Sequence, residues 1–117
     1  MTKDSDQLRL KHIRQSIEKV EQLAHTLHTC GNFESKWVER YALLYCLEVI
    51  GEASINISED LKEAYPDVAW KEMRGLRNII VHQYYYLSLT IIWDVVINDI
   101  PVLKGQVMGI IKDINNK

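Results

Sequence analysis

The sequence predicts a single all-α domain, a bundle of four to five helices. Only five glycines and two prolines occur among its 117 residues, which favours long helices over many short strands. Apolar residues recur three and four positions apart along most of the chain, the spacing of helices that bury one face. The chain has no repeat, low-complexity tract or linker-like stretch, so we expect residues 1–117 to form one domain.

The first predicted helix begins near Asp4 or Ser5, since either side chain can cap its first turn. Gly31 is expected to end this helix, because glycine readily adopts the left-handed conformation that terminates many helices. Between these ends the apolar residues form a narrow seam, typical of bundles and coiled coils: Leu10, Ile13, Ile17, Val20, Ala24 and Leu27.

The second predicted helix covers residues 35–58 and is expected to be the central, most buried one. Gly51 lies inside it, at a cost of about 1 kcal/mol relative to alanine. We therefore expect another helix to approach closely at this glycine. Apolar residues occupy most sides of this helix: Trp37, Val38, Tyr41, Leu44, Tyr45, Leu47, Val49, Ile50, Ile55 and Ile57.

The middle of the chain contains a clear break. A short helical turn at 59–64 is followed by Tyr65 and Pro66, which disfavour a continuous helix. Asp67 is expected to cap the third helix, which carries most of the polar residues of interest.

The last third of the chain returns to a helical spacing that continues to residue 114. Ser88 or Thr90 can cap the fourth helix. Pro101 either kinks this helix or starts a fifth one with Asp99 as its cap.

Charge is unevenly placed along the chain. The net charge of −2 argues against broad, nonspecific nucleic-acid binding, which requires an overall basic surface. Residues 48–67 are acidic, whereas residues 71–86 carry three basic residues against Glu72. Such a local basic site suits a small or briefly held phosphate ligand.

Several classes of protein are disfavoured. Two cysteines are too few for a disulfide framework, and neither they nor the four histidines show the spacing of a metal site, so we expect no metal and no cofactor. Residues 2–7 are polar, unlike a signal peptide, and no apolar run approaches the ~18 residues that span a bilayer. We expect a cytoplasmic protein without a membrane segment.

Residues 74–84 concentrate the potential chemistry of the chain. Arg77, Asn78, His82 and Tyr84 supply a fixed cation, an amide, a group that titrates near neutral pH and a phenol. Together such groups can bind a phosphate, move a proton and accept a modification. The alternative is an ordinary solvated helix face, since polar residues mostly lie outside.

Helix geometry separates these residues into two faces. At 100° per residue, Arg74, Asn78 and His82 align on one side, while Tyr84 continues an apolar stripe. Arg77 falls beside that stripe, roughly 140° from His82. The two residues can therefore cooperate only if the helix ends near His82 or if a second copy supplies the missing partner. The apolar stripe consists of Met73, Leu76, Ile80 and Tyr84.

Two carboxylates lie one turn apart in the most apolar helix, Glu48 and Glu52. Both can lie on its exposed edge. Alternatively, one of them pairs with Arg74 or Arg77 and holds the guanidinium in place, which would offset the cost of placing a charge there.

Between Leu43 and Leu103 the chain carries several motifs in order: Ile50-Gly51-Glu52-Ala53, Tyr65-Pro66-Asp67-Val68-Ala69-Trp70, Gly75-Leu76-Arg77-Asn78-Ile79-Ile80-Val81-His82-Gln83-Tyr84, Trp93 and Asp99-Ile100-Pro101. With these motifs the chain resembles the HepT-like ribonuclease family, within the HEPN superfamily of helical bundles. Residues 1–35 match only in being helical.

The resemblance implies a homodimeric HEPN-type bundle that acts as the RNase toxin of a two-component module. Its active site is expected at the two-fold interface, and no metal is expected to take part. Arg77 and His82 are the implied catalytic residues, supported by Arg74, Asn78 and Glu52. The implied partners are an RNA substrate and a minimal nucleotidyltransferase antitoxin, MntA, which adds AMP to Tyr84 and silences the enzyme.

Two alternatives stay open. The stretch after the motif is Tyr84-Tyr85-Tyr86-Leu87-Ser88, where many relatives carry an acidic residue, so the modified tyrosine is Tyr84, Tyr85 or Tyr86. A non-catalytic subunit that binds a nucleotide or a nucleotidyltransferase would also use Arg74, Arg77 and His82.

Overall fold

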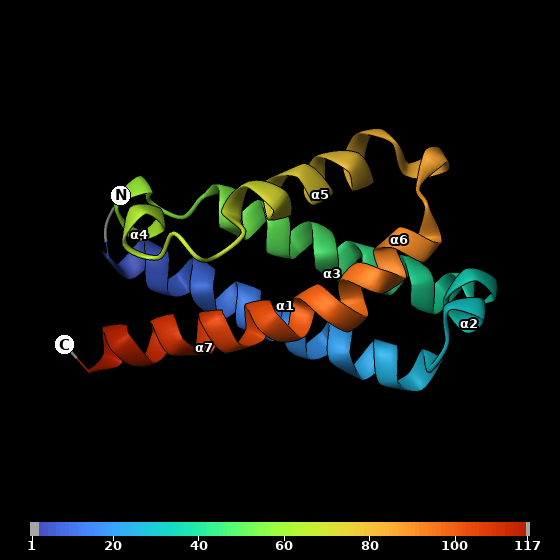
Figure 1. The fold of residues 1–117 in the computed structure, drawn as a ribbon, viewed down its shortest axis with the longest axis horizontal. Helices are drawn as coiled ribbons and strands as arrows, with labels where there is room; N and C mark the ends of the chain where they lie inside the picture. Colours follow the sequence, from blue (N-terminus) through green and yellow to red (C-terminus); the bar gives the residue numbers. More distant parts are fainter. Residues whose placement is uncertain (1–2, 117) are drawn as a thin grey trace.

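The computed structural model describes residues 3–116, which are helical apart from short connections (Figure 1). The bundle measures 45 × 27 × 21 Å. The all-α prediction is confirmed, and the longer segments α1, α3, α5 and the continuous α6–η2–α7 form the bundle. The elements are α1 (Lys3–Leu27), α2 (Cys30–Ser35), α3 (Trp37–Ile55), α4 (Glu59–Ala64), α5 (Trp70–His82), the 3₁₀ turn η1 (Tyr84–Tyr86), α6 (Leu89–Asp94), the π-helical turn η2 (Val95–Asp99) and α7 (Ile100–Asn115).

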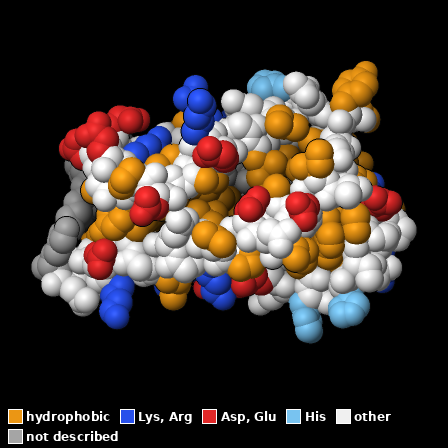
Figure 2. All heavy atoms as spheres, in the orientation of Figure 1, with side chains coloured by type: hydrophobic (Ala, Val, Ile, Leu, Met, Phe, Trp, Pro, Cys, Tyr) orange, Lys and Arg blue, Asp and Glu red, His pale blue; other side chains and the backbone are white. Residues whose placement is uncertain are grey.

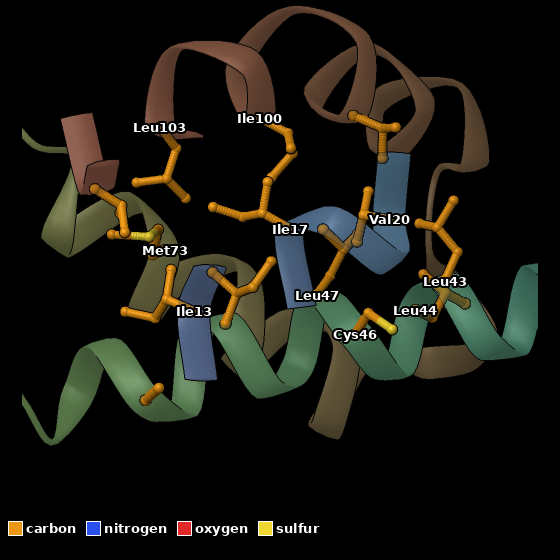
Figure 3. Packing of buried hydrophobic residues seen from close by; sticks show 14 of the residues in the cluster. Ile13, Ile17, Val20, Leu43, Leu44, Cys46, Leu47, Met73, Ile100 and Leu103 are labelled. Carbon is orange, nitrogen blue, oxygen red and sulfur yellow. The ribbon is translucent and has the colours of Figure 1, made fainter. Parts of the chain in front are cut away.

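The core lies where α1 packs against both α3 and α7. The predicted seam of α1 is confirmed: all its members are fully buried except Ala24, which is partly buried. Each fully buried aliphatic side chain stabilises the fold by about 1.5–3 kcal/mol relative to exposure. Figure 3 shows Ile13, Ile17 and Val20 of this seam facing Leu43 and Leu47 of α3 and Ile100 and Leu103 of α7.

Both predicted ends of the first helix are wrong. Asp4 and Ser5 already lie inside α1, so neither caps it. At the other end, His28 has the left-handed φ of 72°, and α1 ends at Leu27. Gly31 instead lies inside α2. α1 ends before Gly31 because a carbonyl group of its last turn finds a partner there: the Leu27 carbonyl accepts from the Asn32 side-chain amide at 2.6 Å.

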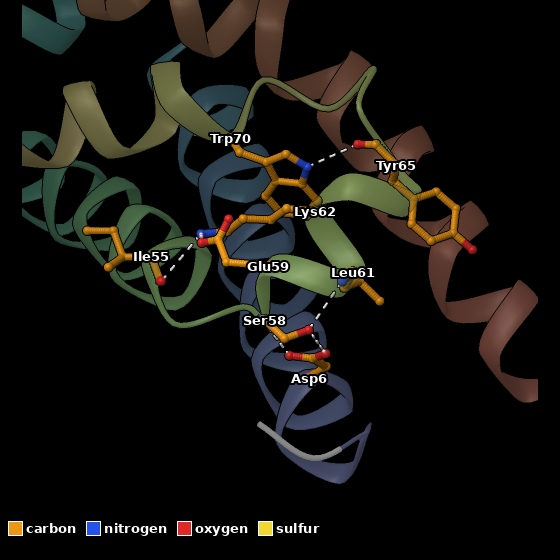
Figure 4. A network of polar contacts seen from close by, with 8 residues as sticks. All are labelled: Asp6, Ile55, Ser58, Glu59, Leu61, Lys62, Tyr65 and Trp70. Atoms are coloured by element: carbon orange, nitrogen blue, oxygen red, sulfur yellow. Dashed lines mark hydrogen bonds and ion pairs between the residues drawn. The ribbon is translucent and has the colours of Figure 1, made fainter.

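Asp6 connects the start of α1 to the start of α4. Its carboxylate is buried and accepts hydrogen bonds from the Ser58 N–H at 2.9 Å and the Ser58 hydroxyl at 2.6 Å (Figure 4). The same hydroxyl accepts from the Leu61 N–H at 3.2 Å and so caps α4. The short helical turn predicted at 59–64 is therefore confirmed and is held against α1.

The second helix is shorter and less buried than predicted. α3 packs against α1 and α5 through one face, but four apolar residues on its other side are 48% to 65% exposed. The sequence shows that this helix is apolar on most sides, but not how many neighbours cover it within one copy. The exposed residues are Trp37, Val38, Tyr41 and Tyr45.

Gly51 lies at the crossing of α3 and α5, as predicted. A Cβ atom at this position would lie 2.4 Å from the Arg77 Cβ and 2.9 Å from the Met73 carbonyl oxygen. Real Cβ atoms do not approach other atoms this closely, so the crossing requires glycine.

Neither of two further predicted cap residues makes a capping hydrogen bond. Asp67 precedes α5 but does not cap it; the N-cap is Ala69, which has no capping side chain. The loop before α5 is held instead by the Trp70 indole N–H, which donates to the Tyr65 carbonyl at 3.0 Å (Figure 4). Asp99 does stand at the predicted N-cap position of α7, but its side chain makes no capping hydrogen bond, since it also lies inside η2 with helical backbone angles.

The fourth helix begins as predicted, with the Ser88 hydroxyl accepting from the Ile91 N–H at 3.4 Å. It then continues through η2 into α7 without a break. Pro101 lacks an N–H and disfavours a regular α-helix. The π turn accommodates it: the Ile100 N–H bonds to the Val95 carbonyl, five residues back.

Replacing Gly51 by alanine should lower the free energy of unfolding by about 1–3 kcal/mol, because the new methyl group forces α3 and α5 apart. Urea unfolding followed by circular dichroism measures the loss. Gly109→Ala is the matched control, since a Cβ there meets nothing within 4 Å. It should leave stability unchanged or raise it. Equal stabilities of the two variants would contradict the close crossing.

Candidate active site

α5 presents the residue pattern that the sequence predicts. Met73 and Ile80 are buried and Leu76 is half-buried, whereas Arg74, Asn78 and His82 are exposed on the outer side. The apolar stripe holds α5 against α3, so the outer residues are free to meet a ligand. Arg77 is also half-buried, between these two faces.

Arg77 is fixed by two side-chain contacts at the Gly51 crossing. Its Nε donates to the Glu52 carboxylate at 2.8 Å, and its Nη1 donates to the Asn78 amide oxygen at 3.0 Å. The Arg77 side chain is 27% exposed and that of Glu52 is 53% exposed, so the pair opens to solvent. Of the two alternatives for the carboxylates of α3, the pairing with Arg77 is the one observed, and Glu52 makes it. Arg77 is held in one orientation with its Nη2 amino group making no hydrogen bond to a described residue.

His82 is the last residue of α5 and is exposed. Both Arg77 and His82 lie within α5, so the roughly 140° between them persists. α5 also ends at His82, so the first of the two conditions set by the sequence is met, and cooperation across a second copy stays a prediction.

Tyr84 lies beyond α5, in η1, and is half-buried. Its ring meets those of Tyr41 and Tyr85 edge to face, each at 5.5 Å between centroids. Burial, followed by the Tyr41 hydroxyl, raises the pKa of Tyr84 above its ordinary value, while the Arg40 guanidinium opposes the shift. A phenol with its ordinary pKa is already protonated at neutral pH, and this shift extends the protonated range. Tyr85 and Tyr86 are 91% and 88% exposed.

An exposed aromatic face joins the N-terminal half of α3 to the end of α5. The rings of Trp37 and Tyr41 lie 5.6 Å apart between centroids, and Tyr41 also contacts the Tyr84 ring. Together with Tyr85 these rings form a continuous surface. The sequence predicts Trp37 and Tyr41 to lie in the core, and their exposure corrects that prediction. The recurrence of Trp37, Tyr41 and Tyr45 every fourth residue places them on one side of the helix and could have indicated it.

Arg40 is a second residue that the sequence analysis did not single out. Its guanidinium donates to the carbonyl groups of Phe33 and Glu34 at the end of α2 and lies 5.6 Å from the Tyr41 ring. Arg40 therefore links the end of α2 to the Tyr41 ring of the aromatic face.

Within residues 3–116, no group of three or more His, Cys, Asp or Glu side chains is placed to hold a metal ion. Cys30 and Cys46 are both free thiols. None of the helices in this range is long and apolar enough to cross a membrane.

The sequence profile of the family described as ribonuclease HepT-like matches residues 13–110. The chain belongs to this family. The resemblance noted from the motifs is thereby confirmed, and the matched range includes α3, α5 and every residue of the candidate site.

Individual relatives agree with the family profile. A candidate RNase of Methanocaldococcus jannaschii, MJ1380, is 47% identical over 68 residues, which cover 58% of this chain and 62% of that protein. A second candidate RNase of this organism, MJ1216, is 41% identical over 78 residues, which cover 67% of this chain and 64% of MJ1216. A Thermococcus cleftensis protein assigned as ribonuclease HepT is 36% identical over 98 residues, covering 83% and 87%.

The chain thus spans less than two thirds of the two Methanocaldococcus relatives and most of the Thermococcus one. No solved structure is significantly similar to the chain.

Proposed function

We propose that this protein is a metal-independent endoribonuclease of the HepT type. The observation that carries the proposal is the Arg77 guanidinium of α5, which Glu52 of α3 holds in place. The exposed His82 lies on the same helix as Arg77, and relatives of the chain are named as RNases. RNA supplies its own nucleophile, the 2′-hydroxyl group. The enzyme must then provide a base, an acid and a cation, and these residues supply all three functions.

In the proposed reaction, His82 removes the 2′-hydroxyl proton, and the 2′-oxygen attacks the adjacent phosphorus. The charge that develops on the phosphorane oxygens is stabilised by the planar guanidinium of Arg77. The bond from phosphorus to the 5′-oxygen then breaks, and an imidazolium returns a proton to the leaving oxygen. The products are a 2′,3′-cyclic phosphate and a 5′-hydroxyl end.

Glu52 and Asn78 are proposed to position Arg77. Glu52 binds the Nε edge and Asn78 binds Nη1, so the guanidinium enters the reaction with its orientation set. Arg74 is proposed to hold a neighbouring phosphate, since it is exposed on the same side of α5 as Asn78 and His82.

We propose that the working enzyme is a homodimer in which Arg77 of one copy and His82 of the other act on one phosphate. The separation of these residues on α5 supports this arrangement. The exposed aromatic face also supports it, because contiguous apolar surface on a protein of this size commonly marks an interface.

The regulatory part of the proposal concerns a nucleotidyltransferase antitoxin that transfers AMP to Tyr84. The phenol oxygen attacks the α-phosphorus of ATP, pyrophosphate leaves, and the phenol proton passes to a base of the partner. A phenol is protonated at neutral pH and the pKa of Tyr84 is raised further, so the partner supplies this base. The bound AMP adds a negative charge two residues from His82, where it can occupy Arg77 in place of RNA.

A binding subunit without catalysis is the second candidate, favoured by the fact that Arg77 is already neutralised by Glu52. Cleavage of RNA in the presence of EDTA separates the two functions. The purified protein should cleave, and Arg77→Ala and His82→Ala should each reduce the rate by about 100-fold or more while leaving the helical content unchanged.

Lys71→Ala is the matched control for this experiment, because Lys71 is an exposed basic residue of α5 outside the motif. It should retain most of the activity. Undiminished cleavage by either motif variant would show that another site, or a contaminating nuclease, is responsible.

Incubation with the partner nucleotidyltransferase, ATP and magnesium should add one or more AMP units, seen by intact mass. Tyr84→Phe should lose the addition and remain an active RNase in the presence of the partner. Tyr85→Phe and Tyr86→Phe are the matched controls and should still be modified. An unchanged mass shift in Tyr84→Phe would move the modification to Tyr85, Tyr86 or another residue.

A further inference from the structure

A cleft of about 410 Å³ opens between α5 and α7, on the opposite side of α5 from its polar outer face. α3 forms its floor with Leu47, Ile50 and Gly51, and Leu76 and Leu103 lie on its two walls. α5 packs on α3 but scarcely touches α7, which leaves this space open. Figure 2 shows the hollow on this face of the molecule, lined by hydrophobic side chains with acidic side chains around it.

The rim of this cleft is acidic. Asp67, Glu72 and Asp99 line it and are exposed, and none of its described lining residues is a lysine or arginine. Three carboxylates repel a phosphate backbone, so the cleft does not suit RNA. An occupant with an apolar body and positive charges matches both its lining and its rim.

The shape of the cleft indicates the form of the occupant. Its walls are two helices, and residues of α7 line it at successive turns: Ile100, Leu103 and Gln106. A groove between two helices accommodates a third helix, which inserts apolar side chains three and four positions apart. Val102 stands at the edge with 61% of its side chain exposed, a further apolar contact for such a segment.

We propose that the cleft between α5 and α7 binds an amphipathic helix of a partner protein, with an apolar face flanked by lysine or arginine. This site is separate from the proposed RNase chemistry, although the two share α5. Its occupant contacts Met73, one turn before Arg77, and Leu76, which directly precedes Arg77, and it rests on the Gly51 crossing.

The test uses three short helical peptides on the ¹⁵N-labelled full chain: one with leucines on one face and lysines on the other, one with glutamates in place of the lysines, and one with alanines in place of the leucines. Only the Leu/Lys peptide should bind. Its chemical-shift changes should map to Leu76, Val102 and Gln106 on the walls of the cleft.

Charge reversal on the rim, Asp67→Lys with Glu72→Lys, should weaken this binding by about tenfold, since each exposed charge pair contributes up to about 1 kcal/mol. The matched control is Asp60→Lys with Glu63→Lys, which makes the same charge change on exposed residues of α4 outside the cleft. It should bind within about twofold of the unaltered chain.

Several results would overturn the proposal. They are equal binding of the glutamate peptide, equal weakening by the control variant, absence of binding by any peptide, or shifts that map to the aromatic face. An oligoribonucleotide that shifts the same cleft residues would also overturn it. So would protection of the cleft by a second copy, seen as a dimer that Val102→Glu dissociates. Because the readout is binding, these outcomes do not depend on RNase activity.

Discussion

Gly51 lets α5 lie against α3 at a distance that no side chain would allow, and this crossing fixes where Arg77 and Glu52 meet. The Arg77 Cβ occupies the space that a Gly51 Cβ would fill, so the arginine side chain lies beside Glu52, the residue that follows Gly51 in α3. Its guanidinium then finds the Glu52 carboxylate at 2.8 Å. The same crossing forms part of the floor of the acidic cleft. One close contact between helices therefore determines the position of the candidate catalytic cation and of the surface behind it.

The sequence predicts those parts of the structure that depend on periodicity. The buried seam of α1, the two faces of α5 and the close approach at Gly51 all follow from spacing and from the cost of glycine in a helix. Helix ends were harder, because several side chains compete for the same free backbone groups. Hydrogen bonds of Thr29 and Asn32 hold the turn directly after Leu27, so α1 ends there and not at Gly31. A π turn accommodates Pro101 within a continuous helix.

The candidate site shows the same division between local and non-local information. Arg77, Asn78 and His82 could be identified from their chemistry and spacing. The choice of Glu52 over Glu48 depends on how α3 and α5 cross, which spacing within one helix does not reveal. The aromatic face was misassigned to the core because an apolar helix looks alike whether its second face meets the same chain or another molecule.

Arg77 and His82 are proposed to act on one phosphate only across two copies of the chain. Mixing purified Arg77→Ala and His82→Ala proteins, after subunit exchange has been verified, tests it directly. Half of the dimers then carry one of each chain, and each of these has one intact site, so about a quarter of the unaltered activity should return. A mixture that exchanges subunits and stays inactive would contradict a shared site. So would full RNase activity from a protein that light scattering shows to be monomeric.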